Sequence, residues 1–140
     1  MTNTKPHPAH TLLNPPALHD PVRFGYSHTA AVPAGTGLVF VSGQYGSAPD
    51  GSVVSPDFAA QVNQTFANLA TALTAHGLDL SHVVSFRAYV VDHDVTKLGP
   101  LAEAIAQHWG TTPPTQTLLG ITSLAMPDML FEVEAIAAHP

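Results

Sequence analysis

The segment TTPPTQTLLGI, residues 111–121, places one amide side chain at the start of an apolar run. Gln116 follows Pro113 and Pro114, whose rings fix φ and restrict the entry to the run. A glutamine offers neutral N–H donors and a carbonyl acceptor, so it pairs better with an amide, a neutral carbonyl or a hydroxyl than with a carboxylate. Gln116 is therefore a candidate ligand-binding residue. The alternative is a structural hydrogen bond at the strand end or across an interface.

The second candidate is Glu134, which lies in the otherwise apolar stretch FEVEAIAA near the C-terminus. A carboxylate in such a strand must find a partner, or its pKa must rise. The functional hypothesis is a general acid/base that orders a water molecule. The alternative is a salt bridge to Arg87, which lies in the middle of VVSFRAYVVD. Arg87 is in turn a candidate either for an interface ion pair or for the positive charge that Gln116 lacks.

Histidine and aspartate residues offer weaker signals. His28 could titrate near neutral pH, but a single histidine is usually only a packed or exposed ring. The DHD segment, residues 92–94, resembles a metal cluster, yet neighbouring side chains on a strand point in opposite directions. Asp before a helix is also a common cap. We therefore expect neither a metal nor a cofactor.

Composition narrows the function classes. The chain has 140 residues, a net charge of −6 and only four lysines and arginines, so it cannot build the basic surface that nucleic-acid binding needs. It has no cysteine, which excludes disulfides and thiolate nucleophiles. Charged residues make up 10%, against about 25% in an average domain. A homo-oligomer with uncharged interfaces would explain this deficit, and so would a compositional bias towards Ala and Thr.

The sequence predicts no membrane association. No run approaches the roughly 18 apolar residues of a membrane helix, and no signal peptide is evident, so a cytoplasmic location is expected. Residues 1–21, rich in Pro and His, are expected to form an extended arm before one domain over 22–140.

The elements that must position these residues follow the order ββαβαββ, an α+β fold with one sheet and two helices on one face. Strands are predicted over 23–32, 38–44, 82–92, 115–121 and 129–138, and the second helix within 92–110. The first helix is predicted to start from an N-cap at Ser55, with Pro56 and Asp57 in its first turn, and to close at Gly77. Gln61 is predicted to lie off its apolar stripe, which consists of Phe58, Val62, Phe66, Leu69 and Leu73. The first two strands should pair as a hairpin. Alternation places Phe86 and Val133 under the helices. It places four residues on the opposite face: Arg87, Tyr89, Glu132 and Glu134.

The segments GYSHT, LVFVSGQYG, VVSFRAYVVD, WGTTPPTQT and FEVEAIAA, in this order and spacing, resemble the RidA/YjgF family from about Asn14 to the C-terminus. The resemblance implies a fold like the chorismate mutase of bacilli. It also implies a homotrimer with a central barrel and small-molecule pockets between subunits. The activity it implies is hydrolysis of enamines and imines to keto acids and ammonia.

By position, the resemblance places Tyr26, Ser42 and Glu134 in the pocket, with Glu134 as the catalytic candidate. The alternative for Tyr26 and Ser42 is a satisfied buried hydroxyl and a core serine. Gln116 stands where active members carry an arginine that holds the substrate carboxylate. Leu118 occupies the position of a frequent cysteine, and Ala102 that of a frequent asparagine.

Two functional hypotheses remain, and both need the inter-subunit cleft. The first is an enzyme of the enamine/imine deaminase type. The second is a binder of a small molecule, such as an imine, an enamine or a keto acid, that has lost the activity with the arginine. Weaker charge-assisted bonding at Gln116 favours the second, and retention of Glu134 and Tyr26 favours the first. An endoribonuclease, an older label for the family, is disfavoured by the acidic charge.

Overall fold

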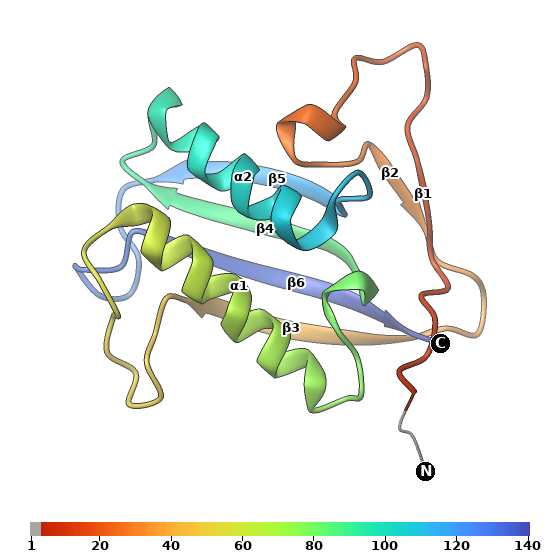
Figure 1. Ribbon diagram of the computed structural model, residues 1–140, viewed down its shortest axis with the longest axis horizontal. Helices are drawn as coiled ribbons and strands as arrows, with labels where there is room; N and C mark the ends of the chain where they lie inside the picture. Colours follow the sequence, from red (N-terminus) through yellow and green to blue (C-terminus); the bar gives the residue numbers. More distant parts are fainter. Residues whose placement is uncertain (1–3) are drawn as a thin grey trace.

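The computed structural model describes residues 4–140 as a layer of two α-helices over a sheet, with a small two-stranded ribbon at one side (Figure 1). The strands are β1 (Thr11–Leu13), β2 (Thr29–Ala31), β3 (Gly37–Tyr45), β4 (Val83–Val91), β5 (Thr115–Ile121) and β6 (Phe131–His139). The helices are α1 (Phe58–Thr74) and α2 (Leu98–Trp109), with short 3-10 turns η1 (Val22–Phe24), η2 (Leu80–His82) and η3 (Val95–Lys97).

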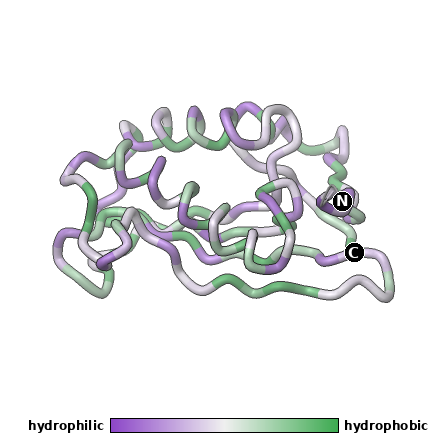
Figure 2. The backbone as a smooth tube through the Cα atoms, turned by 60° about the horizontal axis from the view of Figure 1, so that its bottom comes forward, coloured by the Kyte–Doolittle hydropathy of each residue, from purple (hydrophilic) through white to green (hydrophobic). Residues whose placement is uncertain are grey.

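The main sheet has the strand order β3-β6-β4-β5. β6 runs antiparallel to both β3 and β4, whereas β4 and β5 are parallel and are joined through α2. Both helices lie on the same side of the strands (Figure 2). This arrangement confirms the predicted α+β class, with a single main sheet covered on one face by two helices.

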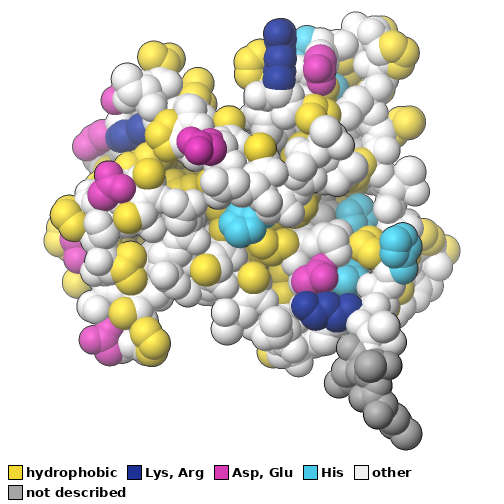
Figure 3. All heavy atoms as spheres, in the orientation of Figure 1, with side chains coloured by type: hydrophobic (Ala, Val, Ile, Leu, Met, Phe, Trp, Pro, Cys, Tyr) yellow, Lys and Arg dark blue, Asp and Glu magenta, His cyan; other side chains and the backbone are white. Residues whose placement is uncertain are grey.

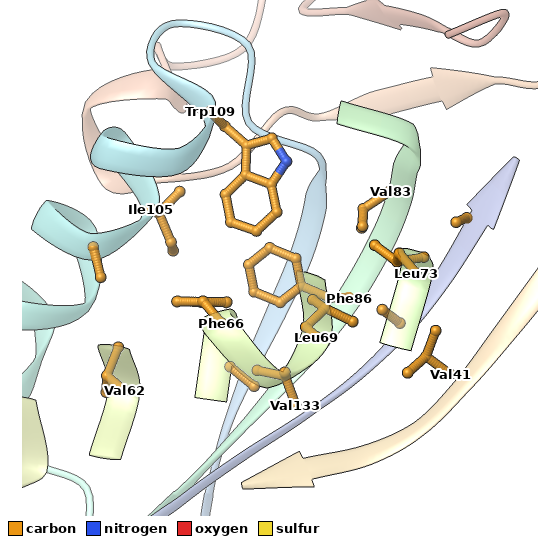
Figure 4. Close-up of a cluster of buried hydrophobic side chains, with 14 of the residues drawn as sticks. Val41, Val62, Phe66, Leu69, Leu73, Val83, Phe86, Ile105, Trp109 and Val133 are labelled. Carbon is orange, nitrogen blue, oxygen red and sulfur yellow. The ribbon is translucent and has the colours of Figure 1, made fainter. Parts of the chain in front are cut away.

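An aromatic cluster joins the helices to the sheet. The ring of Phe86 on β4 stacks on Trp109 of α2, with centroids 5.5 Å apart and an interplanar angle of 19° (Figure 4). Phe66 of α1 meets both rings edge-on, at 5.8 and 5.4 Å. Such offset or edge-on pairs add to the stabilisation from burial alone. The aromatic cluster therefore holds both helices and the sheet in one core.

The predicted alternation of the central strands is confirmed. On β6, the side chains of Phe131, Val133 and Ala135 are buried beneath the helices, while those between them are half-exposed on the open face. On β4 the apolar side chains at even-numbered positions from Phe86 to Val90 are buried in the same way. The open face therefore carries the polar residues of both strands.

Helix α1 is capped two residues beyond the predicted Ser55, whose hydroxyl instead accepts from the Asp57 N–H at 3.0 Å, and it ends before Gly77 as predicted. Asp57 is the N-cap, and its carboxylate accepts a hydrogen bond from the Ala60 N–H at 2.9 Å. Gly77, just beyond the C-terminus, has φ +70°, a conformation that favours glycine. The predicted apolar stripe also faces the core, since Val62, Phe66, Leu69 and Leu73 are fully buried.

The predicted hairpin between residues 23–32 and 38–44 is wrong. Within residues 23–32 only β2 is a strand, and it pairs with β1 rather than with β3. A strand inside the predicted N-terminal arm supplies that partner. Residues 1–3 of the arm lie outside the described residues. The turn over 33–36 therefore links two separate sheets (Figure 1).

Gln61 was predicted to lie off the apolar stripe of α1, but it is completely buried. Its amide donates to the carbonyls of Ser55, at 2.8 Å, and Asp128, at 3.0 Å, and its own carbonyl accepts from Leu130 N–H at 2.9 Å. Gly46 makes room for this side of the helix, since a Cβ there would lie 2.8 Å from Gln61 Cα. Gln61 therefore fixes the loop that leads into β6.

No helix within residues 4–140 combines the length and the apolar character that crossing a bilayer requires. On the helix side of the molecule, acidic and basic side chains are scattered among uncharged and apolar ones (Figure 3).

We predict that Gln61→Leu lowers the free energy of unfolding by about 3 kcal/mol, because two carbonyls and one N–H lose the fully buried amide that bonds them. The matched control is Asn63→Leu, which places the same side chain on the exposed side of the same helix. The control should change stability by less than about 0.5 kcal/mol. Urea unfolding at fixed protein concentration measures both. Equal effects of the two substitutions would contradict the bracing role of Gln61.

Candidate functional site

The open face of the sheet carries a charged cluster on β4 and β6. Glu134 lies opposite Arg87 in the strand register, and Arg87 Nη1 approaches Glu134 Oε1 at 3.4 Å. The hydroxyl of Tyr89 donates a short hydrogen bond to the same oxygen. The alternative that the sequence left open for Glu134, a salt bridge with Arg87, is therefore present in the structure, and Tyr89 completes it.

The two carboxylates of β6 have pKa values displaced in opposite directions. The hydrogen bond from Tyr89 lowers the pKa of Glu134; partial burial opposes this effect, and Arg87 adds to it. Burial raises the pKa of Glu132, and the negative charge of Glu134 raises it further. In return, the hydrogen bond to Glu134 raises the pKa of the Tyr89 hydroxyl. Carboxylates whose environments separate their pKa values are suited to different roles in proton transfer.

Glu132 was not selected as a site residue from the sequence. Its carboxylate lies against Gly43 of β3, where a Cβ would come within 2.5 Å of Glu132 Oε1. Glycine at position 43 therefore leaves room for this side chain. The available sequence signal was the two-residue spacing from Glu134, which places both carboxylates on one face.

A hollow of about 350 Å³ lies on the open face beside this cluster. It is lined by Ser42 of β3, Arg87 of β4 and Glu134 of β6, together with apolar side chains that include Phe40 and Ile136. Phe40 is 73% exposed, which is unusual for a phenylalanine in a sheet. The structure therefore brings together three of the residues singled out from the sequence.

Gln116 lies on the other face. It pairs with Phe86 in the parallel register of β4 and β5, and side chains at paired positions share a face. Gln116 and Leu118 line a hollow of about 360 Å³ with Ala102 of α2 and Tyr26. Within one chain, the sheet thus separates Gln116 from Glu134.

The segment around Tyr26 lies beside the edge strand β5. Ser27 is buried, its N–H donates to the carbonyl of Pro114 at 3.0 Å, and its hydroxyl donates to that of Pro113. These bonds place Tyr26 next to Gln116. A third hollow, of about 330 Å³, lies at the start of β5 and is lined by Tyr26, Gln116 and Arg87. Arg87 therefore lines a hollow on each side of the site.

Tyr26 also belongs to a ring cluster with two histidines. Its hydroxyl forms a short hydrogen bond with His19 Nε2, and His28 Nε2 bonds the His19 carbonyl at 2.8 Å. The rings of His19 and His28 meet at 4.9 Å in an edge-on arrangement. His28 therefore contacts Tyr26 directly, with ring centroids 5.5 Å apart, and also bonds the backbone of His19.

Across residues 4–140, no three histidine, aspartate or glutamate side chains gather in a group that could hold a metal ion. The two aspartates of the DHD segment make separate backbone contacts. Asp94 caps η3 by accepting from Thr96 N–H at 2.8 Å, whereas the carbonyl of Asp92 accepts from Lys97 Nζ at 2.6 Å.

Comparison with known proteins gives consistent results. Residues 19–139 match the family described as Endoribonuclease L-PSP. The RutC family protein YjgH of Escherichia coli is 33% identical over 116 residues, which cover 82% of this chain and 85% of that protein. Protein HMF1 of Saccharomyces cerevisiae is 29% identical over 114 residues, covering 81% and 84%.

Solved structures agree with this assignment. The Rid family protein YyfB of Yersinia pestis superposes with a TM-score of 0.86 at 32% identity, covering 92% of this chain and 98% of that one. Escherichia coli TdcF, solved with bound serine, superposes with a TM-score of 0.65 at 25% identity, covering 78% and 85%. The fold and these matches together show that the chain belongs to the RidA/YjgF family.

Proposed function

We propose that this protein hydrolyses small enamines and imines to keto compounds and ammonia. The observation that carries the proposal is the pair Glu132 and Glu134, whose pKa values are displaced in opposite directions on one sheet face. Hydrolysis of an imine needs a group that takes a proton from water and later returns it to nitrogen. A carboxyl with a raised pKa performs both transfers more readily than an ordinary glutamate does.

Glu132 is the proton-transfer group in this mechanism. Its carboxylate takes a proton from water as the water oxygen bonds to the imine carbon. Glu132 then returns this proton to the nitrogen. As the C–N bond breaks and the C=O bond forms, Glu132 accepts the remaining hydroxyl proton and passes it to the departing ammonia, which leaves as ammonium. Glu134 stays ionised because Tyr89 and Arg87 bond it, and its charge stabilises the cationic iminium form of the substrate.

The proposed site needs more than one copy of the chain. Gln116 and Tyr26 line hollows at the β5 edge, whereas Glu132 and Glu134 project from the opposite face of β6. A homotrimer, whose clefts lie between an edge of one subunit and the open face of the next, would bring them together. The exposed Phe40 and Leu38, 73% and 49% accessible, support an interface on that open face.

The second candidate function is binding without catalysis. It is favoured by Gln116, because a neutral amide holds a carboxylate more weakly than a guanidinium, which adds a positive charge and a second parallel N–H. The RNA-cleaving function suggested by the family's description has less support. A net charge of −6 opposes association with a phosphate backbone.

The enzyme hypothesis predicts a strong effect at Glu132. With 2-aminoacrylate generated in situ, the wild type should accelerate keto-acid formation, and Glu132→Gln should reduce this acceleration about 100-fold or more. Glu134→Ala should also reduce it, because the iminium loses its counter-charge. The matched control is Glu103→Gln on the exposed side of α2, which should keep wild-type activity. No acceleration by the wild type, together with thermal stabilisation by a keto acid, would favour the binder instead.

The opposite pKa displacements can be measured directly. Carboxyl ¹³C NMR should show Glu132 titrating above, and Glu134 below, the ordinary glutamate range. Glu134→Gln removes a neighbouring negative charge, so the pKa of Glu132 should fall towards its ordinary value. The acidic limb of the activity profile, where Glu132 becomes protonated, should move to lower pH in any residual activity. An unchanged Glu132 titration in Glu134→Gln would show that the two carboxyls are not coupled.

A further inference from the structure

Arg23 differs from the other cations of the chain. All four lysines and arginines lie within residues 4–140, and among these described residues Arg23 alone has no oxygen partner. The partners of the other three are Asp79 for Lys5 at 3.8 Å, Glu134 for Arg87 at 3.4 Å, and the Val91 carbonyl for Lys97 at 2.8 Å. In a protein with so few cations, a guanidinium without an oxygen partner is available for a ligand.

The fold holds Arg23 at the mouth of the hollow that contains Gln116. Arg23 lies in the turn η1, and its guanidinium carbon stacks 4.7 Å from the centre of the Phe24 ring. The turn ends at Gly25, which has φ +86° and lies so close to Ile105 of α2 that a Cβ would meet that side chain at 3.1 Å. This close contact fixes η1 against α2, and the ring of Phe24 supports the guanidinium.

The remainder of this hollow is mostly apolar. Its volume is about 360 Å³, within the range of small-molecule sites. Leu98 and Leu101 of α2 and Leu118 of β5 form its walls, and Gln116 supplies an amide beside them. The hollow thus offers a ligand three kinds of contact: the positive charge of Arg23, the neutral amide of Gln116, and an aliphatic wall.

We infer that the hollow binds a carboxylate with a branched aliphatic side chain. Arg23 holds the carboxylate with charge-assisted hydrogen bonds, Gln116 bonds the neutral imine or keto group, and the leucines cover the aliphatic part. This inference rests on the proposed function, because it names the substrate class of that cleft: imines of aliphatic 2-keto acids rather than the shortest ones. Arg23 is thereby a specificity-determining residue.

The test compares the binding of three stable probes by isothermal titration calorimetry. The probes are 4-methyl-2-oxopentanoate, its methyl ester, and pyruvate. The wild type should bind the branched keto acid at least tenfold more tightly than pyruvate, because the longer chain buries more apolar surface. It should bind the ester about tenfold more weakly than the acid, because the ester lacks the charge that Arg23 recognises.

Two variants assign the charge to its source. Arg23→Gln should weaken binding of the keto acid about tenfold and leave binding of the ester unchanged, so that the preference for the acid disappears. Lys5→Gln, which removes one positive charge at Asp79 instead, should keep the wild-type preference. If both variants lost the same amount of affinity for the keto acid, the effect would come from the overall charge of the protein and not from Arg23, and the inference would be overturned.

Other outcomes also decide the matter. An ester that binds the wild type as tightly as the acid would overturn the inference, as would an Arg23→Gln variant that changes only the sizing profile. The latter result would assign the guanidinium to a contact between copies of the chain. Because these are binding measurements, they are separate from catalysis. A protein that shows the acid preference but does not hydrolyse imines would retain this inference and lose the proposed enzyme activity.

Discussion

Strand β6 sets the constraint on which the rest of the structure depends. It is flanked by β3 and β4, and its two-residue period separates a buried face from a half-exposed one. Phe131 and Val133 bury their side chains in the core, while Glu132 and Glu134 lie between them on the opposite face. A shift of one residue in register would place two carboxylates under the helices, at a large cost in desolvation. The packing of the core therefore fixes the position of the acidic pair.

Periodic features of the sequence were sufficient to predict most of the fold. The apolar stripe of α1 and the alternation of β4 and β6 follow from local spacing, and the structure confirms them, whereas the cap of α1 is Asp57 and not the predicted Ser55. The pairing of β2 could not be predicted in the same way. Short strand segments have little preference for a partner, and β2 pairs with a strand eighteen residues upstream instead of its chain neighbour. The burial of Gln61 was missed for a related reason, since its three bonds reach loops distant in sequence.

The site residues likewise divide into those that the sequence could predict and those that only the structure reveals. The cluster of Arg87 and Glu134 was foreseeable, because both residues fall on the open face of adjacent strands. Tyr89 and Glu132 share that face, yet the lowering of the Glu134 pKa by Tyr89 and the raising of the Glu132 pKa by burial and by Glu134 depend on side-chain distances that spacing does not define. Arg23 offered no periodic signal at all. Its significance lies in the absence of a carboxylate partner among the described residues, which only the three-dimensional arrangement reveals.

The contact between Ser27 and the two prolines explains why several candidate ligand-binding residues lie together at the β5 edge of the sheet. Pro113 and Pro114 cannot donate backbone hydrogen bonds, but their carbonyls accept both bonds from Ser27. The chain from Arg23 to His28 is thereby held along the end of β5. Tyr26 then lies beside Gln116, and η1 lies against α2. Because this edge faces away from the carboxylates of β6, a second copy of the chain is the simplest way to complete the site, and the scarcity of charge on the chain is consistent with that requirement.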